Sequence, residues 1–142
     1  MYTVEFKTRW SDFDMNRHMR HTAYNDYAAE SRIRFFSHLD LSIEEIAKDG
    51  FGPVLFSENT VFKKEIHSEE DITVTLQLKA VSEDRRKWKF RHMILNKNKE
   101  VCAIIEVFGA WLDLNKRKIT SLPEKYDDFW NHIDKTDDFE II

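Results

Sequence analysis

The sequence predicts an α+β fold, with an antiparallel sheet of about five strands and helices on one face. Hydrophobic residues alternate with polar ones at the start of the chain, which is typical of a strand, and then recur at helical spacing over residues 22–39. After Gly50 the period changes back to two, and four strand-like segments follow one another. Consecutive strands joined by short turns favour an antiparallel sheet.

Length and composition limit the class of protein. The chain has 142 residues, of which 42% are hydrophobic and 34% are charged, so we expect a folded chain with a real core. The net charge is −4, and without a basic excess we expect no nucleic-acid partner. No apolar run reaches the roughly 20 residues of a membrane span, and Met1–Phe6 lacks the apolar segment of a secretory leader.

Glycine and proline are rare, and no linker or repeat stands out. We therefore expect one domain over residues 1–133, followed by a loose acidic tail over residues 134–142. Cys102 is the only cysteine and lies in an apolar run, so we expect a buried, inert thiol. One cysteine cannot form an internal disulfide, which fits a reducing, cytoplasmic location.

The first quarter of the chain predicts a strand, a loop and a long helix. Residues 2–10 alternate as a strand does, and residues 12–21 are polar and irregular. A helix is expected to begin with Thr22 as its cap and to end near Leu39. Its buried face is predicted to carry Tyr24, Tyr27, Ala28, Ser31 and Phe35.

A short helix and four strands are predicted for most of the remaining chain. Ser42, followed by Glu45, makes a capping-box pattern, and Gly50 is a natural stop, so a short helix fits between them. Strands are predicted over residues 53–66, with a bend near Asn59, and over 72–80, 88–94 and 101–112. The last strand is almost entirely apolar, as expected of a strand covered on both faces. Pro123 suits the first turn of a final short helix through Trp130.

The residues most informative about function precede the long helix. Asp12, Asp14, His18 and His21 fall within residues 12–21. A helix N-terminus offers unpaired N–H groups and the positive end of a dipole, which can bind a carbonyl oxygen as it becomes negative during acyl transfer. A nearby carboxylate can act as a nucleophile or as a general base on water. These residue types therefore favour attack on an acyl group.

Calcium binding is one alternative. Asp12, Asp14 and Asn16 open like an EF-hand loop, but that loop needs glycine at its sixth position and glutamate at its twelfth. Those positions hold Arg17 and Ala23, which argues against calcium.

Two further alternatives are open. Asp14, His18 and His21 could bind a metal, although the sequence suggests no fourth ligand. Both aspartates could also be loop and capping residues without a chemical role. An extended segment would direct Asp12 and Asp14 the same way, so their spacing alone does not choose between them.

The stretch Arg9–Arg32 resembles the signature of hot-dog-fold acyl-CoA thioesterases of the 4-hydroxybenzoyl-CoA thioesterase-like group. That signature has an Asp-x-Asp pair, a loop often reading Gly-His-Val-Asn-Asn, a tyrosine, and Tyr-x-x-Glu-x-Arg on the helix. The matching residues, without a gap, are Asp12-Phe13-Asp14, Arg17-His18-Met19-Arg20-His21, Tyr24 and Tyr27-Ala28-Ala29-Glu30-Ser31-Arg32. The resemblance implies a single hot-dog domain whose sheet wraps around a long central helix.

The resemblance also implies roles for individual residues. Asp14, the second aspartate of the pair, corresponds to the catalytic carboxylate of the family. The backbone N–H of His21 corresponds to the donor to the thioester carbonyl, and the His21 side chain could also contact substrate. His18 is expected either to bind substrate or to fix the loop by a hydrogen bond. Tyr24 is expected to lie beside the substrate.

By the same resemblance, the reaction is hydrolysis of an acyl-CoA to a free acid and coenzyme A, without a metal or redox cofactor. A homodimer or homotetramer is implied, with the sheets of two protomers edge to edge and the site between them.

Arg17 departs from the usual glycine, which often serves a positive φ or a close backbone approach to a ligand. The alternative is therefore a non-catalytic acyl-CoA or acyl-carrier binding module on the same fold. A dehydratase on this fold and a purely structural protein are weaker alternatives.

Charged residues outside this motif are expected to be structural. On the long helix, Glu30 and Arg32 are expected to form an internal ion pair. A solvated strand edge and turn is favoured over contacts to coenzyme A phosphates for six basic residues. These are Lys63, Lys64, Arg85, Arg86, Lys87 and Lys89.

Overall fold

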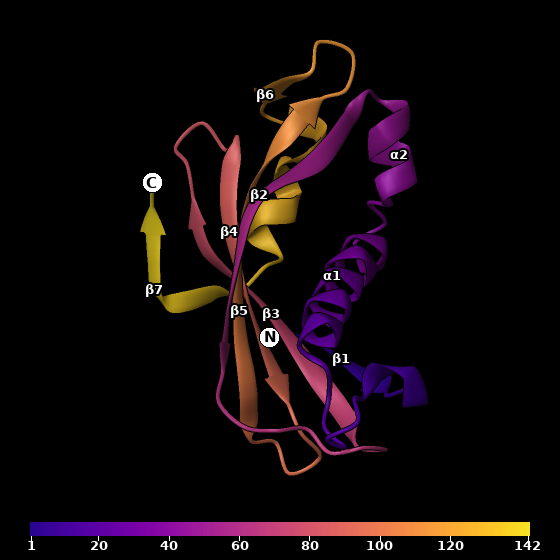
Figure 1. Ribbon diagram of the computed structural model, residues 1–142. Helices are drawn as coiled ribbons and strands as arrows, with labels where there is room; N and C mark the ends of the chain where they lie inside the picture. Colours follow the sequence, from indigo (N-terminus) through magenta and orange to yellow (C-terminus); the bar gives the residue numbers. More distant parts are fainter.

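Seven strands form one sheet, and two α-helices lie on one side of it (Figure 1). The computed structural model describes all residues from Met1 to Ile142. The predicted α+β class is confirmed. The strands are β1 (Tyr2–Lys7), β2 (Phe51–Phe62), β3 (Asp71–Val81), β4 (Lys87–Leu95), β5 (Val101–Asp113), β6 (Lys118–Thr120) and β7 (Lys135–Ile141). The helices are α1 (His21–His38) and α2 (Ile43–Lys48), with 3₁₀ helices at Trp10–Asp12 and Glu124–Asn131.

The main path of the sheet runs β1-β3-β4-β5-β2, and all its neighbouring strands are antiparallel. These are the five strands that the sequence predicts. The additional two lie off this path: β6 pairs with β5, and β7 pairs with β3 in parallel. Because β2 pairs only with β5, its other edge is free.

The acidic tail is ordered, so the expectation of a loose tail is wrong. β1 occupies the edge of β3 over Asp71–Leu76, and β7 pairs with the same strand further along, from Leu78. Basic side chains of β3 and β4 form ion pairs with an acidic side chain of β7. The ammonium of Lys79 lies 3.3 Å from Asp138, and Arg91 binds the same carboxylate at 3.0 Å. This pairing explains why a sequence rich in aspartate forms a strand.

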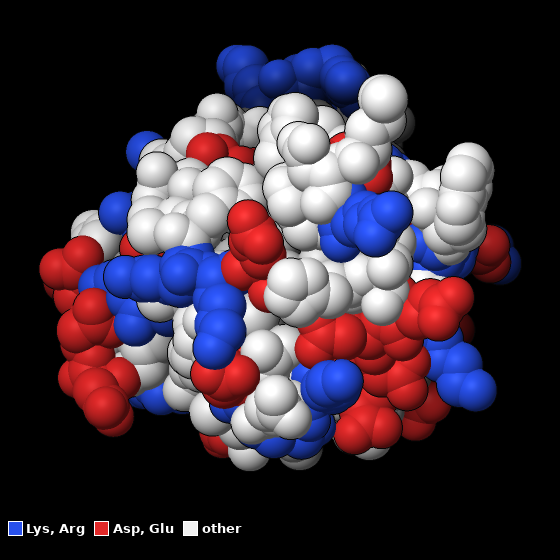
Figure 2. Space-filling model, turned by 60° about the horizontal axis from the view of Figure 1, so that its bottom comes forward, with Lys and Arg blue, Asp and Glu red and all other residues white.

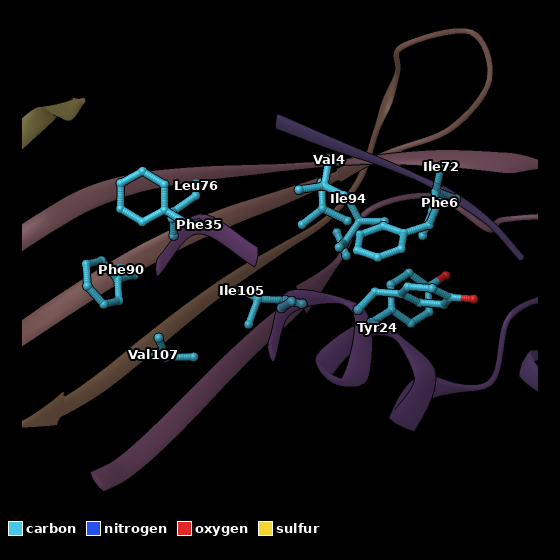
Figure 3. Close-up of a cluster of buried hydrophobic side chains, with 14 of the residues drawn as sticks. Val4, Phe6, Tyr24, Phe35, Ile72, Leu76, Phe90, Ile94, Ile105 and Val107 are labelled. Carbon is cyan, nitrogen blue, oxygen red and sulfur yellow. The ribbon is translucent and has the colours of Figure 1, made fainter. Parts of the chain in front are cut away.

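The core fills the space between α1 and the inner face of the sheet (Figure 3). All five residues of the predicted buried helix face are buried, which confirms that prediction. Near the C-terminal end of α1, Phe36 stacks on Phe129 at 5.3 Å and meets Trp111 edge-on at 5.8 Å. The 3₁₀ helix of residues 124–131 therefore closes one end of the core. Cys102 is buried as a free thiol, as expected.

Several predicted boundaries need correction. The first strand ends at Lys7, because residues 10–12 turn into a 3₁₀ helix. Helix α1 begins at His21 with Arg20 at the cap position, and Thr22 lies inside its first turn. By contrast, Ser42 does cap α2, since its Oγ accepts a hydrogen bond from the Glu45 amide at 3.1 Å.

Strand β2 is shorter than predicted, and its irregularity lies elsewhere. It ends at Phe62, and the register shifts at Phe56, not near Asn59. A second error concerns α1, where Glu30 contacts Arg34 at 3.2 Å and makes no ion pair with Arg32. Residues two apart on a helix do not face each other, whereas residues four apart do.

Strand β2 also carries much of the exposed apolar surface. Between 42% and 52% of the surface of Leu55, Phe56, Val61 and Phe62 is exposed. None of the helices combines the length and apolarity needed to cross a lipid bilayer.

Candidate active site

The loop ahead of α1 is a tight turn that presents Asp14. The amide of Arg17 donates to the Asp14 carbonyl at 3.1 Å, and the Asp14 amide donates to the His18 carbonyl at 3.1 Å. The Asp14 Oδ1 accepts from the amide of Asn16 at 2.8 Å, which is an Asx turn. Arg17 has a φ of 65°, so the position where the family has glycine does require a left-handed backbone.

Asp12 and Asp14 differ completely in environment. Asp12 is fully buried, and its carboxylate accepts hydrogen bonds from the Tyr27 hydroxyl, the Arg9 amide at 2.8 Å and the Arg9 guanidinium at 3.0 Å. Burial alone would raise the pKa of Asp12, but these donors together hold it below its usual value. Asp12 therefore fixes the loop against α1, while Asp14 keeps 34% of its side chain exposed.

The first turn of α1 leaves donors free beside this loop. The first amide of the helix region that finds a backbone acceptor is that of Ala23, which donates to the Arg20 carbonyl at 3.0 Å. The amides of His21 and Thr22 donate no hydrogen bond within the chain. The Arg20 side chain instead binds the Ser11 carbonyl at 3.0 Å and the Thr22 hydroxyl, which ties the helix start to the loop.

All four site residues expected from the sequence line one pocket of about 400 Å³, called here the site pocket. Asp14 and His18 come from the loop, and His21 and Tyr24 from α1. The remaining wall consists of Met19, Phe62, Lys63, Lys64 and Glu65. The sequence favours a solvated strand edge for Lys63 and Lys64, yet both line this pocket. Nothing in the local sequence shows that the end of β2 returns to the loop, because this contact joins residues about 40 apart.

Two contacts hold the end of β2 against α1. Tyr24 is 3% exposed and meets the Phe62 ring edge-on at 5.1 Å. At the next residue of the helix, Asn25 Oδ1 accepts a hydrogen bond from the Thr60 hydroxyl at 2.9 Å. Burial raises the pKa of Tyr24 to about 12, so its phenol stays protonated at neutral pH. Tyr24 thus offers the pocket a neutral aromatic wall.

The imidazole of His18 lies against the loop that carries it. Its Nδ1 lies 3.5 Å from the Met19 carbonyl and 3.6 Å from Asp14 Oδ2. The backbone of the same segment is also tied down, since the Met19 amide donates to the Ile66 carbonyl at 2.8 Å. These contacts favour the loop-fixing role of His18. His21, in contrast, is exposed, and its side chain makes no hydrogen bond.

Charges of both signs surround the site pocket. Lys64 forms an ion pair with Glu100, whereas Lys63 has no ion-pair partner. The face shown in Figure 2 mixes blue and red side chains, with red ones gathered both at the lower right and along the left edge of the view. No three His, Cys, Asp or Glu side chains come close enough together to hold a metal ion.

A second hollow lies on the other side of Asp14. This outer groove, of about 930 Å³, is lined by Asp14, Arg17, Arg9 and the 93%-exposed Trp10, among others. Asp14 borders both hollows, but Arg17 borders only the outer groove. Arg17 therefore does not fill the site pocket.

The arrangement suits attack on a polarised carbonyl. Asp14, whose Oδ2 makes no hydrogen bond within the chain, and His21, whose amide is unpaired, line one partly apolar pocket. A carbonyl bound there could receive a nucleophile from one side and amide hydrogen bonds at its oxygen.

Comparison with known proteins gives the family. The model of the thioesterase-like superfamily matches residues 8–129. Comparison with curated protein sequences gave no match. Among solved structures, a 1,4-dihydroxy-2-naphthoyl-CoA thioesterase from Synechocystis is similar at 17% identity and a TM-score of 0.82, over 92% of this chain and 96% of that one.

Two structures from Staphylococcus aureus are also similar. One is a hypothetical protein in complex with CoA, at 20% identity and a TM-score of 0.83, over 94% of this chain and 85% of that one. The other is a DHNA-CoA thioesterase, at 19% identity and a TM-score of 0.79, over 91% and 85%. At such identities the likeness establishes a shared fold. Together with the family match, it shows that this chain is a hot-dog-fold member of the thioesterase-like superfamily.

Proposed function

We propose that the protein hydrolyses acyl-CoA thioesters to a free acid and coenzyme A. The observation that carries this proposal is that Asp14 lines one pocket with His21, the first residue of α1, whose amide donates no hydrogen bond within the chain. Family membership and the thioesterases among the similar structures support it.

The chemistry follows one of two routes. In the first, Asp14 Oδ2 attacks the thioester carbon, the C–S bond breaks, and water then hydrolyses the acyl-aspartate anhydride. In the second, Asp14 removes a proton from water, whose oxygen attacks the same carbon, and the proton passes to the departing coenzyme A thiolate. In both routes the carbonyl oxygen becomes negative, and the amides at the start of α1 stabilise it. A donor of this kind contributes a factor of roughly 10² to 10³ to kcat.

In this proposal Asp14 and His21 are the catalytic residues, and His18 and Tyr24 are the substrate-binding residues. Tyr24 supplies a neutral wall, and His21 is free to contact the substrate. Lys63 has no ion-pair partner and is the pocket's available cation for a coenzyme A phosphate.

The alternative is a non-catalytic acyl-CoA or acyl-carrier binding module. The observation behind it is Arg17 at the usual glycine position. Since the Arg17 side chain borders the outer groove and not the site pocket, the geometry favours hydrolysis over binding alone.

We also propose that the protein works as a homodimer, or as a homotetramer built from such dimers. The free edge of β2 offers unpaired backbone groups beside exposed apolar side chains, which is the usual surface for strand pairing. Pairing of two β2 edges would bring a second protomer close to Phe62 and the site pocket.

The function is tested with Asp14→Asn and Asp12→Asn on a panel of short, long and aromatic acyl-CoAs. Asp14→Asn should lower kcat by about a hundredfold or more and leave acyl-CoA binding largely unchanged, because the variant keeps the shape but loses the base or nucleophile. Asp12→Asn should cost less in kcat and more in thermal stability, since it weakens the buried network with Tyr27 and Arg9.

Near wild-type turnover in Asp14→Asn would show that the mechanism is wrong. Tight binding of acyl-CoA by a wild-type protein that hydrolyses none of the panel would favour the binding module.

A further inference from the structure

Arg32, in the middle of α1, is a buried cation without a carboxylate partner. It is 9% exposed. Its one hydrogen bond runs from Nη1 to Nε2 of His92, at 3.1 Å. The neighbouring acidic residue of the helix, Glu30, is bound to Arg34 instead. Glu58 acts on Arg32 only from a distance and forms no ion pair with it.

His92 cannot supply the missing negative charge. Its Nδ1 lies 2.9 Å from the Thr75 carbonyl, which only accepts, so Nδ1 carries the proton. Nε2 is therefore the lone-pair side that accepts from Arg32. Full burial and the nearby cation hold His92 neutral. The pair is hydrogen-bonded, but the positive charge of Arg32 is not compensated.

A buried, uncompensated charge is costly, and proteins pair such groups or bind ions to them. A guanidinium has five N–H donors, and Arg32 uses one of them within the chain. Arg32 also lines a small pocket.

This pocket, called here the Arg32 pocket, has a volume of about 190 Å³. Arg32 is its only charged residue. Most of its wall is apolar and comes from α1, β2 and β4, including Ile33, Phe36, Pro53, Leu55, Trp88 and Phe90. An apolar cavity with one cation at its wall matches a ligand with an apolar body and one anionic group.

The Arg32 pocket is separate from the site pocket within one protomer. Arg32 lies eleven residues after His21, which is about 16 Å along a helix. Between them, the Tyr24–Phe62 contact and the Thr60–Asn25 hydrogen bond close the gap between α1 and β2. A molecule in one pocket does not extend into the other without breaking these contacts.

We propose that the Arg32 pocket binds small monocarboxylates, with the carboxylate on the Arg32 guanidinium and an aliphatic or aromatic body against the apolar wall. A carboxylate matches the planar fork of arginine and can accept two of its N–H groups. The volume corresponds to about six water-sized groups, which suits a body such as a hexanoate chain or a benzoate ring. Inorganic phosphate, with more charge and no apolar body, fits this wall poorly. This binding does not depend on the chemistry of Asp14.

The Nε–H signal of Arg32 in nitrogen-15 NMR spectra reports directly on such binding. Sodium benzoate and sodium hexanoate should shift this signal with a dissociation constant on the order of 1 mM, as expected of so few ligand atoms. Benzamide and hexanamide have the same shape without the charge, and they should bind at least roughly tenfold more weakly.

Arg32→Met and Arg34→Met form a matched pair of variants. Arg32→Met replaces the buried charge by an apolar side chain of similar length, and because this gain offsets the lost donor to His92 Nε2, the variant should still fold. It should weaken benzoate binding at least roughly tenfold. Arg34→Met, on the exposed side of the same helix, should leave binding unchanged. If Arg32→Met proves unfolded, the wild-type NMR titration with acid and amide still decides the matter.

Three results would overturn the proposal. The acids and the amides could bind equally well, which would exclude recognition of the charge. Benzoate binding could survive in Arg32→Met but vanish in Asp14→Asn, which would place the acid in the site pocket and support the proposed hydrolase instead. The Arg32 signal could stay unmoved by every ligand while Arg32→Met changes the mass measured by light scattering, which would show that a second copy closes the cavity.

Discussion

Arg17 holds a backbone conformation that side chains rarely adopt, with a φ of 65°. Replacement by glycine relieves this strain but gives the unfolded chain more freedom, so the two effects oppose each other. We expect Arg17→Gly to change the free energy of unfolding by less than about 1 kcal/mol and kcat on a good substrate by less than about a hundredfold.

Urea unfolding and steady-state hydrolysis measure these two effects of Arg17→Gly. If the wild type is inert and Arg17→Gly is an efficient hydrolase, Arg17 blocks turnover, and the result favours the non-catalytic binding module.

His92 makes stability depend on pH. Burial and the positive charge of Arg32 lower the pKa of His92 from 6.5 to about 3. Above pH 6.5 the imidazole is neutral in both states and contributes no slope. Below pH 6.5 the unfolded chain binds a proton that the folded chain excludes. The free energy of unfolding therefore decreases as the pH is lowered from 6.5 to about 3. For this one group the loss between pH 7 and pH 5 is about 2 kcal/mol.

Urea unfolding of the wild type at pH 7 and pH 5 measures this loss. His92→Gln should reduce the difference between the two pH values, whatever its effect on stability at pH 7, and the exposed His38→Gln should leave it unchanged. Equal slopes in wild type and His92→Gln would show that His92 is not the titrating group.

At this same scale, the sequence predicted which candidate residues share a pocket but not their environments. The resemblance and the helix-start argument brought Asp14, His18, His21 and Tyr24 to one pocket. An alternating pattern suggested that the two aspartates point the same way, yet Asp12 turns inward because a 3₁₀ helix interrupts the extended segment. Likewise, only the packing of α1 on β4 shows that Arg32 meets His92, since the two are 60 residues apart.

At the scale of elements, β7 shows where local pattern fails. Its sequence, with Asp137, Asp138 and Glu140, contains residues that are depleted in strands. The strand forms because β3 leaves an edge free beyond β1 and because Lys79 and Arg91 lie beside it. Neither feature is visible within nine residues of sequence. β1 to β5 could be predicted from local pattern, because β1, β3 and β4 alternate clearly and β5 is a nearly continuous apolar run.

Removal of residues 135–142 should lower the free energy of unfolding by about 2–4 kcal/mol and the melting temperature by about 10 °C. The deletion bares the edge of β3 and removes the contact that the partly buried Phe139 makes with the core. Hydrolysis should persist in the folded fraction, because β7 lies across the sheet from α1 (Figure 1).

Thermal unfolding followed by circular dichroism tests this deletion, with Asp137→Asn as a control, since Asp137 makes no ion pair. An unchanged melting temperature would mean that the β7 pairing contributes nothing.

At the scale of the whole molecule, one edge of the sheet is covered and the other is open. β1 and β7 together cover the outer side of β3, whereas β2 has no neighbour on its outer side. We expect light scattering to give at least twice the mass of one chain at micromolar concentration. Val61→Lys, on the open edge, should shift this mass toward one chain, because a charge opposes strand pairing there.

Ile141→Lys provides the matched control, because Ile141 is 54% exposed on the opposite edge. It should leave the mass unchanged. A wild type that scatters as a single chain across this range would exclude the dimer and a site shared between protomers.

The position of β2 has a consequence for how this protein tolerates sequence change. One end of the strand borders the site pocket through Phe62, the other borders the Arg32 pocket through Leu55, and its outer edge is free. Few of its side chains are buried within one chain, so a library of single substitutions selected for folding alone should accept many residues along it. The same library selected for thioester hydrolysis should reject most of them. The gap between the two tolerance profiles should be wider along β2 than along the buried β3, where folding already restricts nearly every position.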